Sequence, residues 1–201
     1  MDDQCRTLNA RIIPWLAEVR AESELELWEA AALAEPLGHL PIQTRVNSSW
    51  ASEGLAVLCW AIERFELPAH DCCVDPKAVT NAVEFLQPVA ATLARRVTLR
   101  SCNEIQTGAD RAFAVHWRLR QFSLTCTHMD FADFARNAWF GPLNIEGVTL
   151  ADSDLSIGGV PIARAGPAAV QTAASIAVER HRAFNWLLGY SETYSEVDTS
   201  T

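Results

Sequence analysis

The segment ERHRAFNWLLGY, residues 179–190, concentrates side chains whose types could do chemistry. His181 and Asn185 are four residues apart, so on a helix they share a face, where the amide can fix the tautomer of the imidazole. Arg180 could hold a carboxylate or an anionic ligand. These residues allow two interpretations: a catalytic or binding constellation, or polar groups on the inner face of a helix.

Helical spacing places Arg180 within an apolar stripe formed by Ala173, Ile176, Ala177, Ala183, Phe184 and Leu187. Arginine is almost never buried without a partner, so this guanidinium needs an acidic side chain or a ligand. The acidic candidates are Glu53, Asp110 and Glu179. We expect a buried ion pair that joins helices, and binding of an anionic ligand is the alternative.

A second histidine, His116, precedes Trp117 on another expected helix and falls near core positions. If His116, Arg180 and Glu53 converge, they form an acid–base and anion-holding trio. The alternative hypothesis is therefore a small-molecule or anion-binding pocket, or a hydrolase-like active site, lined by Trp60, His116, Arg180 and Asn185.

Six cysteines occur without CxxC spacing. A zinc site is conceivable from Cys72, Cys73, Cys126 and His128, but adjacent cysteines chelate one ion poorly and the usual short loop between two ligands is missing. We expect free thiols, no metal and no cofactor.

Composition and missing motifs narrow the function further. The net charge of −9 disfavours a nucleic-acid binder. The longest uncharged apolar run, residues 54–62, is too short to cross a membrane, and the start lacks a secretory signal, so we expect a cytoplasmic protein. No GxSxG, Walker phosphate loop or HExxH motif occurs, which favours a non-enzymatic role.

Helical periodicity and end signals predict the elements that must position these residues. Capping boxes are expected at Ser23 with Glu26 and at Ser101 with Glu104, and Asp75 followed by Pro76 should start a further helix. Gly189 is expected to cap the last helix. The expected helices span about 4–20, 23–34, 50–65, 76–86, 102–124, 130–139 and 167–189.

Between 143 and 162 the apolar period changes to two. Turns at 146–147 and 158–159 predict a small antiparallel meander of three or four strands, with Pro161 on an edge strand. The spacing also places Arg120 beside core positions, and we expect the tryptophans to fill the core: Trp50, Trp60, Trp117, Trp139 and Trp186. The predicted fold is a single α+β domain over residues 1–201, mainly helical, with the meander before the C-terminal helix.

Three segments, WASEGLAVLCWAIERFELP, ADRAFAVHWRLR and ERHRAFNWLLGY followed by YSEVDTST, resemble the domain of unknown function 4272 family over about residues 24–201. The resemblance implies a widespread bacterial domain without an established activity. Its C-terminal signature falls on Glu179, Arg180, His181, Ala183, Asn185, Trp186 and Leu187, with Phe184 where the family usually has leucine. Its other matching positions are Trp60, His116 and Trp117.

The family's acidic tail falls on residues 197–201, where Ser200 replaces an aspartate, so any role of that aspartate is in doubt here. From the acidic charge, the missing catalytic motifs and the many aromatic residues, we expect a non-enzymatic protein-interaction or accessory domain, immunity-type proteins included. The partner and the oligomeric state are left open.

Overall fold

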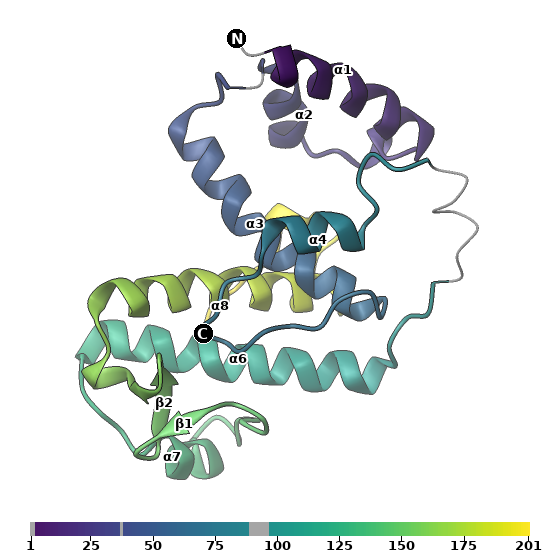
Figure 1. Ribbon diagram of the computed structural model, residues 1–201. Helices are drawn as coiled ribbons and strands as arrows, with labels where there is room; N and C mark the ends of the chain where they lie inside the picture. The colour runs from purple at the N-terminus through teal and green to yellow at the C-terminus, as the bar shows by residue number, and fades with distance from the viewer. Residues whose placement is uncertain (1–2, 37, 89–96) are drawn as a thin grey trace.

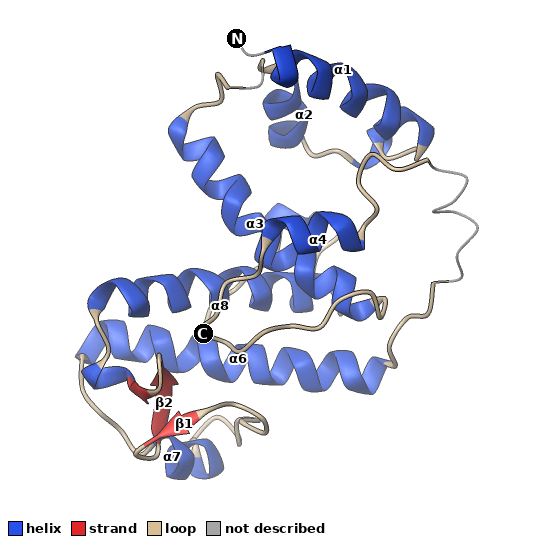
Figure 2. Cartoon of the chain, viewed as in Figure 1, coloured by secondary structure: helices blue, strands red, loops and turns tan. Residues whose placement is uncertain are grey.

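A computed structural model describes residues 3–36, 38–88 and 97–201 of the chain (Figure 1). Helices make up most of it, and a small antiparallel sheet precedes the C-terminal helix, which confirms the predicted α+β class (Figure 2). None of the helices in these described ranges is both long and apolar enough to cross a membrane.

The first helices are α1 (Asp3–Glu18) and α2 (Leu27–Ala34), with a short 3₁₀ turn, η1 (Glu22–Glu24), between them. The expected start of the second helix at Ser23 is wrong, because Ser23 belongs to η1 and Leu25 is extended. The first turn of α2 is instead closed by Glu29, whose carboxylate accepts the Glu26 backbone N–H at 2.9 Å.

The apolar helix, α3 (Ile42–Ala61), begins eight residues earlier than the predicted start near Trp50. Its first turns are mostly polar, and their apolar residues Ile42 and Val46 are exposed. A Gln43–Asn47 amide bond of 2.8 Å links successive turns. Its second half, from Glu53 to Ala61, contributes most of its buried residues, as expected for a core helix.

The next two helices begin at their predicted caps. The carboxylate of Asp75 accepts the Lys77 N–H at 2.9 Å and starts α4 (Pro76–Ala82), which ends four residues earlier than expected. Ser101 and Glu104 form the predicted capping box of α6 (Cys102–Thr125).

The helix α7 (Phe131–Asn137) leads to three short strands, β1 (Leu150–Ala151), β2 (Asp154–Ile157) and β3 (Val160–Pro161), paired antiparallel in that order. Pro161 lies on an edge strand, as predicted. The β2–β3 turn is the predicted Gly158–Gly159 pair, with φ of 62° and 82°.

The expected hairpin at Glu146–Gly147 is wrong. No strand occurs at 143–149, because the side chain of Asn144 accepts the Glu146 N–H at 3.0 Å and closes a local turn instead. The β1–β2 turn is Asp152–Ser153, two non-glycine residues with φ of 48° and 64°. Positive φ at both positions is the conformation that a tight hairpin needs.

The C-terminal helix, α8 (Pro167–Leu187), follows the 3₁₀ turn η2 (Ile162–Arg164). It ends as predicted at Gly189: the N–H groups of Gly189 and Tyr190 bond to the carbonyls of Trp186 and Asn185, at 2.9 and 3.1 Å. A last 3₁₀ turn, η3 (Tyr194–Glu196), follows.

The core forms on both sides of α8, which packs against α3 and α6 (Figure 1). One apolar cluster joins α6 and α8 to β2 through residues such as Leu119, Leu155 and Ala177. A second joins α3, α6 and α8 through Val57, Ile105 and Phe184. This packing brings the signature on α8 against residues more than 60 positions away in sequence.

Candidate functional site

Arg180 and Glu53 form a buried ion pair between α8 and α3. Nε of Arg180 lies 3.0 Å and Nη2 2.9 Å from the same carboxylate oxygen, and the two residues are 7% and 2% exposed. Of the three acidic candidates, Glu53 is therefore the partner. The buried ion pair expected from the sequence is present.

The other N–H groups of Arg180 fasten the loop that follows α3. Nη1 donates to the carbonyls of Pro68 and Ala69, and Nη2 to that of Cys72, at 2.9 to 3.1 Å. The second carboxylate oxygen of Glu53 accepts the Val74 N–H at 2.8 Å. The guanidinium thus makes four hydrogen bonds within the protein, and its Nη2 also lies within ion-pair distance of the Glu53 carboxylate.

The two core histidines contact each other across α6 and α8. Nδ1 of His116 lies 3.0 Å from Nδ1 of His181, and Nε2 of His181 lies 3.2 Å from the side-chain nitrogen of Asn185. That amide also donates to the carbonyl of Asp198 at 3.0 Å. An amide nitrogen only donates, so Nε2 of His181 accepts, and its Nδ1 carries the proton that it donates to His116.

Burial determines the charge of this histidine pair. It lowers the pKa of both imidazoles to about 4, with smaller contributions from Arg120 at His116 and from His116 at His181. Both rings are therefore neutral at pH 7. The expected trio of His116, Arg180 and Glu53 does not form, because the hydrogen-bond partner of His116 is His181.

A second buried ion pair escaped the sequence analysis. Arg118 and Asp154, both 0% exposed, form two parallel hydrogen bonds of 2.7 Å between α6 and β2. Arg120, which the spacing placed beside the core, is exposed. The available signal was Asp154, a charged residue at the start of the central strand DLSI, where burial would require a cation as partner.

The tryptophans follow the expected core role in part. Trp60 packs edge-on against Phe184 with ring centroids 5.4 Å apart, and Trp117 stacks on Phe134 at 4.4 Å. Trp50 and Trp186 are half-buried. Trp139 is 89% exposed, so its interpretation as a core filler is wrong. It follows the end of α7, where the chain turns toward Gly141 instead of back to the core.

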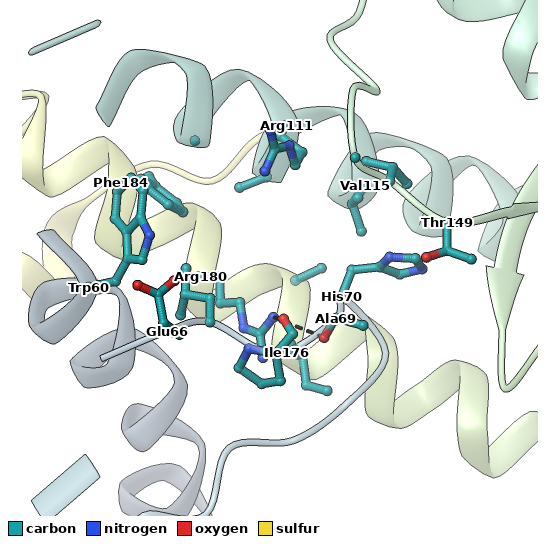
Figure 3. Close-up of a pocket in the computed structure, with 17 residues that line it drawn as sticks. Trp60, Glu66, Ala69, His70, Arg111, Val115, Thr149, Ile176, Arg180 and Phe184 are labelled. Atoms are coloured by element: carbon teal, nitrogen blue, oxygen red, sulfur yellow. Dashed lines mark hydrogen bonds between the residues drawn. The ribbon is translucent and has the colours of Figure 1, made fainter. Parts of the chain in front are cut away.

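A cavity of about 400 Å³ lies between α6, α8, the loop after α3 and the segment 147–149. Figure 3 shows Trp60 and Phe184 at one end, His70 and Thr149 at the other, and Arg111 on the α6 side. Trp60 and Arg180 therefore line it as hypothesised, but His116 and Asn185 are not among its lining residues. His70 and Arg111 are lining residues that the sequence analysis did not single out.

The residues of the zinc hypothesis have other roles. Cys126 ends α6 with φ of 53°, His128 lies 2.9 Å from the carbonyl of Asp152, and Cys72 and Cys73 are exposed on the loop after α3. Across the described ranges, no group of three or more His, Cys, Asp or Glu side chains is placed to hold a metal ion.

An apolar surface is exposed on α2 and the first half of α3. Leu27 and Ile42 are 93% and 72% exposed, and Trp28 and Val46 are also exposed. Ile42, Val46 and the half-buried Trp50 follow at intervals of four, so they form one helical stripe. We call Leu27, Trp28, Ile42, Val46 and Trp50 the α2–α3 surface.

This surface borders a second cavity, of about 480 Å³, between α3, α8 and η3. Trp28 and Trp50 line it together with the signature residue Glu179, whose carboxylate pairs with Arg182 at 2.6 Å. Nε of Arg182 and the hydroxyl of Tyr194, both at this cavity, are buried without a hydrogen-bond partner. Trp186 packs edge-on against Tyr194 at 6.1 Å.

Comparison with protein-family models, with curated proteins and with solved structures gives no match for this chain.

Proposed function

We propose that this chain is a non-enzymatic protein-interaction domain of the domain of unknown function 4272 family, acting in the bacterial cytoplasm as an accessory or immunity-type protein. The observation that carries the proposal is the α2–α3 surface. Large exposed apolar side chains are a common feature of protein-binding sites, and two members of this surface, Trp28 and Trp50, line the same cavity. Leu27 is almost fully exposed and Ile42 is largely exposed, and apolar surface of this kind is costly to leave in water.

The chemistry of the signature supports a non-enzymatic role. Arg180 pairs with Glu53 and donates to three backbone carbonyls, and His116 and His181 are neutral, buried and bonded to each other. None of these groups is free to exchange a proton with a substrate. The signature side chains link α3, α6 and α8 through the Arg180–Glu53 and His116–His181 contacts. These contacts hold in place the buried second half of α3, which continues from the exposed first half.

Charge indicates the kind of partner. Five glutamates lie on or next to η1 and α2, at 22, 24, 26, 29 and 35, and the whole chain carries −9. Like charges repel, so this surface disfavours a second copy of the chain. The partner we propose is a protein segment with apolar anchors bordered by Lys and Arg, which an amphipathic basic helix would supply.

The test uses a photo-crosslinking residue placed at Leu27 in cells, with the same residue at Leu124 as the matched control. Leu124 is also strongly exposed, at 78%, but lies at the far end of α6. We expect one partner to crosslink from position 27 only. Binding of that purified partner should weaken roughly tenfold or more in the variant Leu27→Asp/Ile42→Asp, and stay unchanged in Leu124→Asp.

Crosslinking mainly to a second copy of the chain, or equal crosslinking from both positions, would contradict the proposal. So would a partner whose affinity is the same for the double variant and the parent protein. Circular dichroism of each variant, compared with the parent, checks that the aspartates act at the surface and leave the fold intact.

A further inference from the structure

The cavity beneath α6 has the size and walls of a small-molecule site. Its volume of about 400 Å³ falls in the range of ligand pockets, which is about 300–1,000 Å³. Its apolar end is formed by Trp60 and Phe184, which lie edge to face (Figure 3). Gly108 makes this end possible, because a Cβ at that position would come within 2.5 Å of the Phe184 ring.

Arg111 is the polar group that remains unexplained. Its side chain comes from α6 into the wall of the cavity, and its guanidinium carbon lies near Gly147. It makes no hydrogen bond or ion pair with any residue that the structure describes, and its Nε is buried without a partner. A buried donor that lacks an acceptor costs about 1–3 kcal/mol. The Nη groups of Arg111 are not among the buried atoms, so they are the donors that a ligand in the cavity can reach.

The neighbouring charges limit what this ligand can be. Arg180, on the opposite wall, is already neutralised by Glu53. Glu66, at the edge of the cavity, is exposed and pairs with Arg100 at 3.3 Å. One unpaired guanidinium therefore faces the cavity, and it matches the single charge and the two oxygens of a carboxylate. A phosphate with two charges would be only half compensated in a protein of net charge −9.

His70 adds a second polar position. Its Nε2 lies 2.7 Å from the carbonyl of Ser156, which can only accept, so Nε2 carries the proton and Nδ1 is an acceptor. Burial lowers its pKa, partly offset by the Ser156 bond and by Asp71, with a small further decrease from Arg180. Nδ1 has no hydrogen-bond partner within the described residues.

We propose that this cavity binds a small monocarboxylate with an aromatic or branched apolar body. The carboxylate forms two hydrogen bonds with Arg111, and the apolar body fills the end formed by Trp60 and Phe184. A hydroxyl or amine on the far side of the ligand can donate to Nδ1 of His70. The proposal is independent of the α2–α3 surface, whose residues on α2 and the first half of α3 are not among those that line this cavity.

The probes are phenylacetate, its neutral amide phenylacetamide, and acetate, each titrated into the full chain by calorimetry and by ligand-observed NMR. We expect phenylacetate to bind with a dissociation constant near or below about 1 mM. The amide should bind roughly tenfold more weakly because it has no charge to pair with Arg111, and acetate should bind weakly because it has no apolar body.

The variant Arg111→Met removes the guanidinium, and Arg120→Met is its matched control. Arg120 is an exposed arginine nine residues along the same helix, on the opposite face. We expect Arg111→Met to bind phenylacetate and phenylacetamide equally, and to be at least as heat-stable as the parent because it loses an unsatisfied buried donor. Arg120→Met should keep the preference for the acid.

A second variant, Arg111→Lys, keeps the charge without the planar fork and should bind phenylacetate with intermediate affinity. Equal affinity of the parent for acid and amide would overturn the proposal. It would equally be overturned by an affinity that Arg111→Met leaves unchanged, or by the absence of binding to any probe at about 10 mM.

Discussion

Nε of Arg180 donates a hydrogen bond of 3.0 Å to the carboxylate of Glu53, a residue 127 positions away in sequence, in the interior of the protein. The same two side chains make four further hydrogen bonds with the backbone between Pro68 and Val74: Arg180 donates three and Glu53 accepts one. The pair therefore does more than neutralise two charges: it joins α3 to α8 and fixes the loop that forms one wall of the cavity. Its removal should affect both stability and the cavity.

Arg180→Met is expected to destabilise the protein by about 3–5 kcal/mol, because it leaves the Glu53 carboxylate buried without its cation. The double variant Arg180→Met/Glu53→Met should recover a large part of that loss, since no unpaired charge remains. Urea denaturation gives both free energies. The exposed pair Arg136–Asp133 supplies the control: Arg136→Met should change stability by less than about 1 kcal/mol. A loss for Arg180→Met as small as that of the control would contradict this account.

Asp154→Asn should be as costly as Arg180→Met, about 3–5 kcal/mol, because it strands the guanidinium of Arg118 with no exposure to water. Each oxygen of the Asp154 carboxylate also accepts a backbone N–H, that of Leu155 at Oδ1 and that of Met129 at Oδ2, so the nitrogen that replaces one oxygen loses one of these bonds. Burial raises the pKa of Asp154, but hydrogen bonds from Arg118 lower it overall. Thermal unfolding followed by circular dichroism measures the loss, and an unchanged midpoint would show that the pair is dispensable.

The histidine pair should make the protein acid-sensitive. Burial lowers the pKa of His116 and His181 to about 4, below the ordinary histidine value of 6.5, so between these pH values the unfolded chain binds more protons than the folded one. The contribution of these two neutral histidines to the free energy of unfolding is complete above about pH 6.5 and is lost as the pH falls toward 4. His70, whose pKa is also lowered by burial, acts in the same direction.

The check is the free energy of unfolding measured from pH 7.5 to 4.5. We expect it to fall with decreasing pH in the parent, and to fall less steeply in His116→Leu/His181→Leu. The exposed His39 provides the control, since His39→Leu should leave the slope unchanged. Equal slopes in the parent and the double variant would rule out this origin of the acid sensitivity.

Gly54 and Tyr194 form a coupled pair that a double-variant cycle can test. A Cβ at Gly54 would lie 2.0 Å from the Tyr194 hydroxyl, so Gly54→Ala should destabilise the protein despite the better helix propensity of alanine, which contributes about 1 kcal/mol. That hydroxyl is itself buried without a partner, so Tyr194→Phe should be neutral or stabilising. With the hydroxyl removed, the nearest ring atom is 3.3 Å away, and Gly54→Ala should become close to neutral. Additive effects of the two changes in urea denaturation would contradict the coupling.

The sequence correctly predicted those helix ends and turns that depend only on residues close together in the chain. The caps at Asp75 and at Ser101 with Glu104, the turn at Gly158–Gly159 and the end of α8 at Gly189 all lie where the sequence placed them. Each depends on backbone N–H groups or φ angles that the residue itself satisfies. The burial of Arg180 was predictable for a similar reason, since helical period alone placed it among apolar neighbours.

The elements whose predicted position was wrong depend on contacts with distant parts of the chain, which the local sequence pattern does not reveal. The first half of α3 is mostly polar and exposes Ile42 and Val46, so it resembled a loop. Ser23 had the sequence of a cap but lies in a 3₁₀ turn. Asp152 and Ser153 adopt positive φ without glycine, in a hairpin whose buried strand β2 packs against α7 and α8.

By itself, the sequence determined the helical content, the small sheet before the last helix, and the need of Arg180 for a buried partner, because these follow from periodicity and from the cost of burying a charge. The identity of that partner, the bond between His116 and His181, the Arg118–Asp154 pair and the unpartnered Arg111 came only from the tertiary structure. Each joins residues on different elements, and their distances are set by how α3, α6, α8 and β2 pack, which no local spacing encodes.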